Sequence, residues 1–405
     1  GAFQPFDNTF TVAKSALFPT SDGNLSKTFG AAGNQKKWTF STWLKKCANG
    51  TTLNVFRTSH GNDTAIQFNS DKLQFYVWNG SSYLTNILTT DVYQDASQWF
   101  HLVLKWDSTP STPSASSIAF YVNGVQVTAL DTAVYPSQNV DSGWNGNGAQ
   151  TIGIEGTGSD WDGYMSEIVF IDNDALAASS FGQTDTSTNK WIPKDVSGLT
   201  YGTNGFYLNF SNASDLGEDQ ENSNDWTNNN SVVQVTDSPT SNFGTLAVNG
   251  GACTITNGNR TNQGASGGYG HAVSGLSFKH EKIFCAIIVV DGGSGAQVNT
   301  GMSVVPDTYV PIASNGSNTG TFANIQTYGT TLRVIPAIPG TDAVIGHSIA
   351  VADGDYLTCA VDPDQGNIWF GFYDTSAGTH QYLPNTAGGT AGNPADGTLP
   401  TVTGR

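Results

Sequence analysis

The chain has 405 residues, a formal net charge of −17 and only 12% charged residues, whereas 38% of its residues are hydrophobic. This length predicts two or three domains. The negative charge argues against nucleic acid as a partner, because the chain would repel phosphate. No apolar run approaches the length of a membrane span, and the hydrophobic share is too high for a disordered chain. We therefore expect folded domains that neither bind nucleic acid nor insert into a membrane.

The composition also predicts the fold class. Aromatic residues make up 11% of the chain, glycines number 47, and helical patterns rich in Lys and Glu are missing. Short runs of β-branched and aromatic residues separated by turn residues are typical of antiparallel β-proteins. We predict an all-β protein of two antiparallel β-sandwich (jelly-roll) domains. Residues 1–235 form the first, 236–244 a linker, and 245–405 the second.

Regularly spaced alternating runs predict the strands of the first domain. They cover residues 38–44, 52–57, 64–68, 72–78, 98–106, 118–127 and 151–154. Asn79-Gly80 and Asn123-Gly124 have the sequence of tight hairpin turns. Many short strands with turn signals between them indicate a β-sandwich.

The run from Trp161 to Phe181 predicts a central strand. Alternation over residues 164–171 places Tyr164, Ser166, Ile168 and Phe170 on one face, and Met165, Glu167, Val169 and Ile171 on the other. Asp172-Asn173-Asp174 ends this strand, and residues 175–181 suggest a short helical turn.

Three stretches together resemble laminin-G-like, concanavalin-type sandwich domains. They are the strand at residues 38–44, the pair at residues 99–103 and 120–125, and the Gly163-Tyr-Met-Ser-Glu-Ile strand with the small-Leu-small turn after it. The resemblance covers about residues 1–200. It implies a β-sandwich, often with a calcium ion at one rim.

Residues 182–242 resemble a module of tail-fibre and head-surface proteins of tailed phages, notably marine ones. The run includes the strand at residues 205–210 and the acidic stretch that holds Asn224-Asp225-Trp226. This resemblance implies a place on the virion surface, with other virion proteins and copies of the same chain as partners.

The second domain resembles SPRY domains, which are binding sandwiches and not enzymes. The resemblance rests on Gly354-Asp-Tyr-Leu, the Val361-Asp pair, Gly366-Asn-Ile-Trp-Phe and Gly392-Asn-Pro-Ala. These predict a hairpin of residues 354–362 and 366–372. The final strand of the SPRY pattern does not follow. We therefore expect residues 395–405 to meet a neighbouring subunit or to run into further chain.

No catalytic group is expected. Concanavalin-type hydrolases need two carboxylates on one strand face, whereas the spacing of Glu167 and Asp172 places them on opposite faces. The Gly264-Ala-Ser-Gly-Gly268 run lacks the strand and helix of a nucleophile elbow. His101 lies within a strand, where a structural role is the simpler interpretation. The six histidines have no zinc-motif spacing.

Binding residues are sought among loop and hairpin aromatics, which could stack on sugar rings. The candidates are Trp78, Tyr83 and Trp144, and the alternative is that they cover an end of the sandwich. Asp160 and Asp162 are candidate calcium ligands, with an Asx-type turn as the alternative. No other cofactor is expected.

The four cysteines have no metal-ligand spacing. Cys285 and Cys359 lie in apolar strand patterns, and buried thiols or a disulfide between the two both remain open.

We interpret the chain as a non-enzymatic virion surface protein: a tail fibre, head fibre or decoration protein that displays sandwich domains toward host-surface glycans. Two alternatives stay open. A bacterial extracellular adhesin would carry a secretion signal, and a concanavalin-fold glycan hydrolase would turn over a polysaccharide.

Overall fold

The computed structural model describes residues 10–19, 23–153, 159–229, 232–251, 253–264, 270–274, 283–288, 299–303, 322–328, 331–335, 345–362, 364–384, 389–395, 397–398 and 400–401. These residues form strands, turns and loops, with a single 3-10 turn, η1 (Ala178–Ser180). The predicted all-β class is confirmed. None of the helical structure in the described part is long and apolar enough to cross a membrane.

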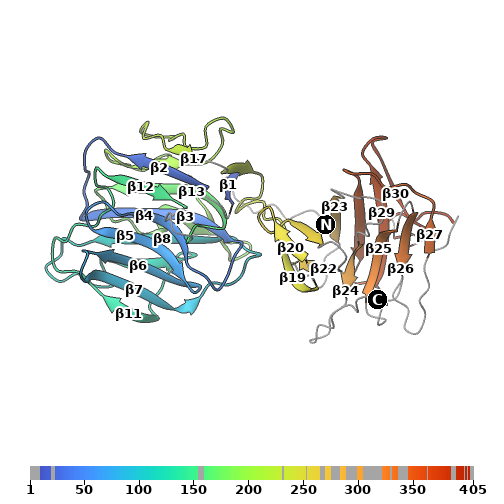
Figure 1. Ribbon diagram of the computed structural model, residues 1–405, viewed down its shortest axis with the longest axis horizontal. Helices are drawn as coiled ribbons and strands as arrows, with labels where there is room; N and C mark the ends of the chain where they lie inside the picture. The colour runs from blue at the N-terminus through green and yellow to red at the C-terminus, as the bar shows by residue number, and fades with distance from the viewer. Residues whose placement is uncertain are drawn as a thin grey trace.

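Two sheets pack face to face in the N-terminal part of the chain (Figure 1). Sheet A has the order β10 (Val125–Gln126), β9 (Ala119–Val122), β8 (Phe100–Asp107), β3 (Lys37–Lys46), β13 (Gly163–Asp172), β1 (Ser15–Phe18), β18 (Val233–Val235), with β16 (Phe206–Leu208) also paired to β13. Sheet B has the order β11 (Leu130–Val134), β7 (Tyr83–Val92), β6 (Lys72–Trp78), β5 (Asp63–Asn69), β4 (Leu53–Thr58), β12 (Ala149–Ile152), β2 (Asn24–Thr28), β17 (Thr227–Asn229).

The remaining strands form smaller sheets. β14 (Gly182–Thr184) pairs with β15 (Trp191–Pro193), β19 (Leu246–Gly251) with β22 (Gly270–Ser274), and β20 (Cys253–Thr256) with β21 (Thr261–Gly264). Two four-stranded sheets then have the orders β23 (Ile283–Ile288), β28 (Tyr356–Asp362), β29 (Asn367–Asp374), β30 (Thr379–Tyr382) and β24 (Asn299–Ser303), β25 (Phe322–Tyr328), β26 (Thr331–Ile335), β27 (Ile345–His347). Both contribute to one hydrophobic cluster.

The C-terminal hairpin has the predicted form. β28 and β29 pair in register from Tyr356 opposite Tyr373 to Asp362 opposite Asn367. Cys285 and Cys359 lie opposite each other across β23 and β28. Thr401, which is buried, accepts a hydrogen bond from the Phe370 amide. Residues 402–405, and with them part of the expected subunit contact, lie outside the described residues.

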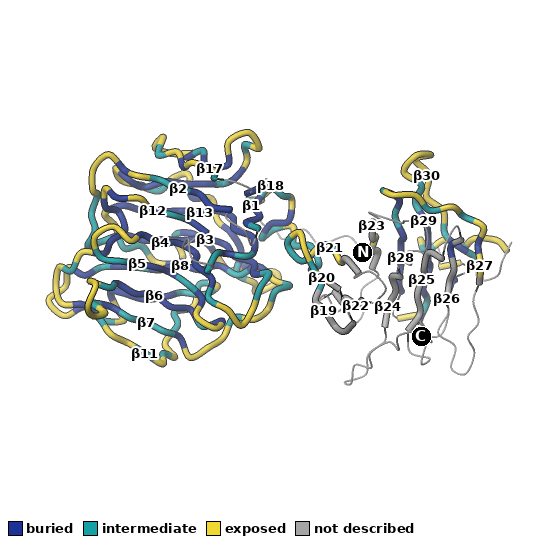
Figure 2. The backbone as a smooth tube through the Cα atoms, viewed as in Figure 1, coloured by how far each residue is buried: buried dark blue, intermediate teal, exposed yellow. Residues whose placement is uncertain are grey.

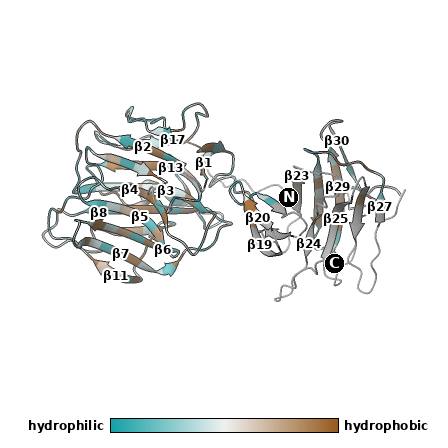
Figure 3. Cartoon of the chain, in the orientation of Figure 1, coloured by the Kyte–Doolittle hydropathy of each residue, from teal (hydrophilic) through white to brown (hydrophobic). Residues whose placement is uncertain are grey.

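The core of the N-terminal sandwich is rich in aromatic rings. Trp38, Phe56, Trp106, Trp144 and Phe170 are all essentially inaccessible to solvent and belong to one cluster between the two sheets. Figure 2 shows the strands of this part as mostly buried and the connecting loops as mostly exposed, and Figure 3 shows hydrophobic residues concentrated on strands. The alternation in the sequence therefore has its expected cause, namely one strand face turned toward the opposite sheet.

A β-bulge interrupts β13 at Glu167. The register between β13 and β3 shifts between Ser166 and Val169, so that Glu167 and Ile168 together face the single residue Thr42. Glu167 has φ +49°, in the left-handed region that side chains other than glycine seldom adopt. An extra residue of this kind bends the strand and reverses its side-chain alternation.

The bulge corrects the predicted alternation of this strand. Ile168 and Phe170 were predicted to share one face of the strand, and both face the core. Met165 was predicted on the opposite face, but it joins the same core cluster. The reason is that the extra residue at Glu167 lies between Met165 and Ile168, so strict period two fails there.

The strand β3 ends in two consecutive buried lysines. Lys45 and Lys46 both have fully buried side chains, and they point to opposite faces because they are neighbours on a strand. Lys46 lies between the sheets, where its Nζ donates to Asp71 Oδ1 at 2.6 Å and lies 4.7 Å from the centre of the Phe68 ring. Burial lowers the pKa of both lysines, and their carboxylate partners oppose that shift.

Lys45 fixes the segment that was predicted to be a linker. Its Nζ donates to Asp237 Oδ2 at 2.8 Å, and Trp99 Nε1 donates to the other oxygen of the same carboxylate at 2.8 Å. The Ser15 hydroxyl donates to the Asp237 carbonyl. Asp237 is itself inaccessible to solvent. The first residues of the predicted linker 236–244 are therefore packed onto the sandwich and do not form a free tether.

We predict that Asp237→Asn lowers the free energy of unfolding by about 3–5 kcal/mol, because it leaves the Lys45 ammonium buried without a counter-charge. The double variant Lys45→Met with Asp237→Asn should lose less than the sum of the single changes. Denaturant unfolding monitored by tryptophan fluorescence would measure the stability of the two single variants and of the double variant.

The matched control is Asp131→Asn, which breaks the half-exposed ion pair with Lys72. We expect it to cost far less than Asp237→Asn, because solvent screens an exposed ion pair. A cost for Asp237→Asn as small as that of the control would contradict the role assigned to the buried pair.

Candidate functional site

Three aromatic rings gather on the outer face of sheet B. Tyr76 and Trp78 are two residues apart on β6 and so share a face, and Tyr83 begins β7 opposite Trp78. The ring centroids of Trp78 and Tyr83 are 4.8 Å apart, and those of Tyr76 and Tyr83 are 5.8 Å apart. Tyr83 is 47% exposed, whereas Tyr76 is buried. We call these three residues the aromatic patch.

A hairpin places the two outer rings. Asn79 follows β6, and its side-chain oxygen accepts the backbone N–H groups of Ser81 and Ser82. This Asx-type turn closes the loop that was predicted at Asn79-Gly80. Because the turn is fixed by its own hydrogen bonds, Trp78 and Tyr83 are held at the end of the hairpin. The sequence-predicted pair is therefore brought together by the structure.

Polar groups flank the aromatic patch on the neighbouring strands. Arg57 of β4 binds Asp63 of β5 through two hydrogen bonds, Nε to Oδ1 at 3.1 Å and Nη2 to Oδ2 at 2.9 Å. Asp63 lies directly opposite Trp78. Burial, and secondly the negative charge of Asp63, raise the pKa of Tyr76 to about 12, so its phenol stays neutral at physiological pH.

A row of amides continues the same face of sheet B. Gln67 donates to Gln74 Oε1 at 2.8 Å, and Gln74 donates in turn to Asn86 Oδ1 at 2.9 Å. Gln74 is two residues before Tyr76 on β6 and so shares its face. Exposed rings beside fixed hydrogen-bonding groups suit a sugar, which offers an apolar C–H face and hydroxyl groups at once. Tyr76 and Gln74 could have been found in the sequence, because they lie two and four residues before Trp78 and so share its strand face. Arg57 and Asp63 could not, because only the sheet register brings them beside these residues.

The third predicted aromatic, Trp144, lies in the core and not on the surface. It is 0% exposed, its ring stacks on Phe56 with centroids 4.1 Å apart, and its Nε1 donates to the Thr64 carbonyl at 3.0 Å. The prediction that it binds a surface ligand is wrong, because the glycine-rich loop around it folds inward between the sheets.

Among the residues that the structure describes, no calcium site forms around Asp160 and Asp162. Burial raises the pKa of Asp162 to about 6, and its backbone carbonyl accepts the Cys47 amide. Across the described residues, no group of three or more His, Cys, Asp or Glu side chains is placed to hold a metal ion. A calcium ion here stays a prediction from the family resemblance.

Glu167 lies in a closed space on the outer face of sheet A. It is 6% exposed, and the Tyr207 hydroxyl donates to its Oε2 at 2.5 Å. Burial raises the pKa of Glu167 to about 7. Asp172 is engaged elsewhere, since its Oδ1 accepts Asn145 Nδ2 at 2.6 Å and the Asn34 amide at 2.9 Å. The two carboxylates do not flank a common cleft.

The space beside Glu167 also contains Ser41 and His101. His101 is 1% exposed, and burial lowers its pKa to about 3. Its Nδ1 accepts a hydrogen bond from Trp191 Nε1 at 3.0 Å, so the ring proton is on Nε2 and is donated to Ser41 Oγ at 2.8 Å. In this tautomer His101 cannot take the Ser41 proton. The cluster lacks the geometry of a serine nucleophile and its base.

The fold and the open face of sheet B define a lectin-like β-sandwich. Residues 20–180 match the concanavalin A-like lectin/glucanases superfamily. This part of the chain is therefore similar to laminin G-like and concanavalin A-like lectin domains. No curated protein is similar enough to match the chain.

Several solved structures are similar to the chain at low identity and low TM-score. The heptameric SAP-like pentraxin from Limulus polyphemus is 17% identical, with a TM-score of 0.36, and the match covers 57% of this chain and 100% of that one. Domains LG4-5 of the mouse laminin alpha1 chain are 9% identical, with a TM-score of 0.35, covering 92% and 78%. Domain 4 of the extracellular arabinanase AbnA from Geobacillus stearothermophilus, solved with arabinotriose, is 18% identical, with a TM-score of 0.31, covering 42% and 76%. These values are too low to transfer a ligand or an activity.

We predict that Glu167 makes stability fall as the pH rises. Its pKa is about 7 in the folded protein and 4.5 in the reference state, so the folded state holds the proton more tightly. As the pH rises, Glu167 ionises in the unfolded state before it ionises in the folded state, and this lowers the free energy of unfolding. The loss develops between pH 4.5 and about 7 and reaches about 3 kcal/mol. Unfolding measured from pH 4 to pH 8 should show this loss.

Glu167→Gln keeps an oxygen acceptor for the Tyr207 hydroxyl and removes the titrating group. We expect this variant to lose the Glu167 component of the pH dependence and to be more stable than the parent at pH 8. An unchanged pH profile would contradict the assignment.

Proposed function

We propose that the chain is a non-enzymatic surface protein of a tailed-phage virion, a tail fibre, head fibre or decoration protein, that binds host-surface glycans through its N-terminal sandwich. The observation that carries glycan binding is the aromatic patch. Trp78 and Tyr83 present a T-shaped ring pair to solvent beside the Arg57–Asp63 pair. An exposed aromatic surface fixed on two paired strands loses little conformational freedom when a ligand binds.

The lectin-like fold supports a binding role for this face. The outer face of sheet A is covered by Phe181, Val196 and Tyr201, which pack on Val103 and Val169. Sheet B has polar and aromatic residues on its outer face. Of the two broad sheet faces, that of sheet B is therefore the one available to a large ligand.

The placement on a virion rests on the sequence resemblance of residues 182–242 to tail-fibre and head-surface proteins. Other virion proteins and copies of the chain are the proposed partners, and the C-terminal sheets are proposed to form a SPRY-like binding sandwich. A bacterial extracellular adhesin is the alternative that shares the same site chemistry. Locating the chain in a virion density map would separate the two.

The absence of catalysis is supported by the state of Glu167 and His101. Both side chains are enclosed on the outer face of sheet A, and their polar contacts are with Tyr207, Ser41 and Trp191. A glycosidase instead needs two carboxylates about 5–10 Å apart on either side of one bound sugar.

We predict that Tyr83→Ala and Trp78→Ala each weaken binding to host-cell glycans about tenfold or more, because each removes a ring face that a sugar would cover. Tyr83→Phe should keep most of the affinity. Binding to a glycan array and to host cells would measure the effect, with Val125→Ala as control, since Val125 is 71% exposed on β10 of sheet A.

Retention of full glycan binding by Tyr83→Ala and Trp78→Ala would overturn the proposed site. The non-enzymatic role has a separate test, which is incubation of the parent protein with host-surface and algal polysaccharides. We expect no new reducing ends. Hydrolysis that is lost in Glu167→Gln would refute the non-enzymatic role.

A further inference from the structure

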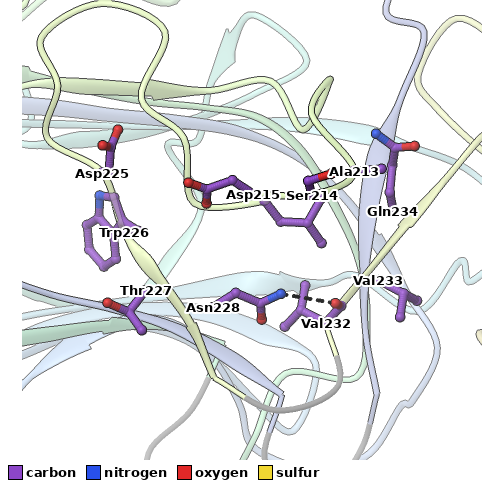
Figure 4. Close-up of a pocket in the computed structure, with 11 residues that line it drawn as sticks. Ala213, Ser214, Asp215, Asp225, Trp226, Thr227, Asn228, Val232, Val233 and Gln234 are labelled. Carbon is purple, nitrogen blue, oxygen red and sulfur yellow. Dashed lines mark hydrogen bonds between the residues drawn. The ribbon is translucent and has the colours of Figure 1, made fainter.

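Two groups of polar side chains in the N-terminal part of the chain differ in their access to solvent. One lines a groove of about 710 Å³ beside β17 and β18, where the carboxylates of Asp215 and Asp225 are exposed (Figure 4). The other surrounds the end of β3, and there the side chains of Lys45 and Asp237 are inaccessible to solvent. Water screens the groups of the groove, whereas the groups around Lys45 interact mainly with one another.

Lys45 contacts a carboxylate and an amide at the same time. Its Nζ lies 2.8 Å from Asp237 Oδ2 and 2.7 Å from Asn242 Oδ1. Because a C=O bond is about 1.23 Å long, Asn242 Cγ lies no more than about 4 Å from this nitrogen. Reacting atoms in a conformation ready for attack are about 3–3.5 Å apart. The amine of Lys45 is therefore close to the position from which it could attack the Asn242 amide carbon. We call these three residues the Lys45 cluster.

Backbone contacts hold the Asn242 amide in this orientation. Its Nδ2 donates to the Ser97 carbonyl at 2.9 Å, so its carbonyl oxygen is the atom that faces Lys45. Three residues further on, the buried Thr245 hydroxyl donates to the Ala96 carbonyl at 2.9 Å. The electrophile is thus fixed to the sandwich by its own hydrogen bonds, and little conformational freedom is lost when the two side chains react.

The Asp237 carboxylate is oriented in the same way. Its Oδ1 accepts the Trp99 indole N–H at 2.8 Å and the Phe243 amide at 3.3 Å. These bonds turn Oδ2 toward Lys45 Nζ. Asp237 Oδ2 and Asn242 Oδ1 contact the same nitrogen, so a proton can pass between the carboxylate and the atoms of the amide.

The surroundings favour a neutral amine on Lys45. Burial lowers the pKa of Lys45 more than the attraction of Asp237 raises it, and the positive charge of Arg260 also lowers it. A Cys47 thiolate would oppose this effect, but burial raises the Cys47 pKa well above its usual range and keeps the thiol neutral. The Tyr164 ring, whose centre is 5.6 Å from Lys45 Nζ, adds an apolar wall.

We propose that Lys45 and Asn242 join through an isopeptide bond, with Asp237 as the proton carrier. Asp237 takes a proton from the Lys45 ammonium, and the neutral amine attacks Asn242 Cγ. Asp237 protonates the oxygen of the tetrahedral intermediate, and it then moves a proton from the attacking nitrogen to Nδ2. The Cγ–Nδ2 bond breaks, and the oxygen proton returns to Asp237. The leaving ammonia takes that proton, so the products are an amide, an ionised Asp237 and one ammonium ion.

The bond would join the central strand β3 to the segment that leads from the sandwich to β19. It closes a loop across 197 positions of sequence, and a crosslink of this kind restricts the unfolded chain more than the folded one. No oxidant, metal ion or second protein is needed. The inference goes beyond the proposed function, because the crosslink uses none of the residues of the aromatic patch and stands whether or not that patch binds a glycan.

Mass spectrometry of the full chain tests the bond directly. We expect the denatured parent protein to be lighter than its sequence by one ammonia. Trypsin should release a branched peptide that joins residues 38–46 to residues 195–260. A succinimide at Asn242 would also lose ammonia, but it would leave the two peptides separate. The proposal is overturned if folded parent protein keeps its full mass after prolonged incubation, or if ammonia is lost without the branched peptide.

Asn242→Ala removes the electrophile and keeps the pair of Lys45 with Asp237. This variant should fold, keep its full mass and unfold at a lower denaturant concentration than the linked parent. The matched control is Asn259→Ala, which removes an amide that donates to the Cys47 carbonyl at 2.7 Å in the same region. We expect the control to form the branched peptide as the parent does. Loss of one ammonia in Asn242→Ala would overturn the proposed link.

The role of Asp237 has its own test. In the fraction of Asp237→Asn that folds, as judged by tryptophan fluorescence, the branched peptide should form about 100-fold more slowly or less, because the proton carrier is gone. A time course after cell-free synthesis of the full chain would measure this rate. Linking as fast as in the parent would refute Asp237 as the proton carrier.

Discussion

Two adjacent lysines at the end of β3 decide how the loops close around the N-terminal sandwich. Because neighbours on a strand point to opposite faces, Lys45 and Lys46 must find separate partners on the two sides of sheet A. A buried ammonium is costly unless it is paired and hydrogen-bonded. Asp71 meets this need between the sheets, and Asp237 meets it on the outer face. The ends of β5 and the segment after β18 are thereby fixed to one strand.

The same requirement joins the sandwich to the residues that follow it. Lys45 Nζ also donates to the Asn242 side chain and to the Phe243 carbonyl, at 2.7 and 2.6 Å. The Tyr164 hydroxyl donates to the carbonyl of Gly258 in the turn between β20 and β21. A second hairpin is therefore held against the outer face of sheet A. These contacts, together with the apolar cover over Val169, leave sheet B as the open face.

The fold shows how a buried carboxylate in a lectin-like sandwich can have a structural role. Glu167 occupies a bulge, a feature that often redirects a side chain toward a site. Here the bulge turns Glu167 toward Tyr207 and under the covering segment, where burial raises its pKa to about 7. A raised pKa in a cleft would suggest an acid catalyst. Without access to solvent or a second carboxylate across a cleft, it indicates a titrating structural group.

The sequence by itself determined the all-β class, most strand positions, the hairpin at Asn123-Gly124 and the candidates Trp78 and Tyr83. It could do so because alternation and turn-forming residues are local features of the sequence. The spacing of apolar residues within one strand shows which of its faces is buried. The sequence could not place Trp144, since an aromatic in a glycine-rich loop looks the same whether the loop turns outward or folds between sheets. The bulge at Glu167 was also hidden, because one extra residue leaves no mark in an apolar run. Only the tertiary structure decided that Asp237 pairs with Lys45 across 192 positions of sequence, or that Asp215 and Trp226 line one groove, because such contacts depend on which strands become neighbours.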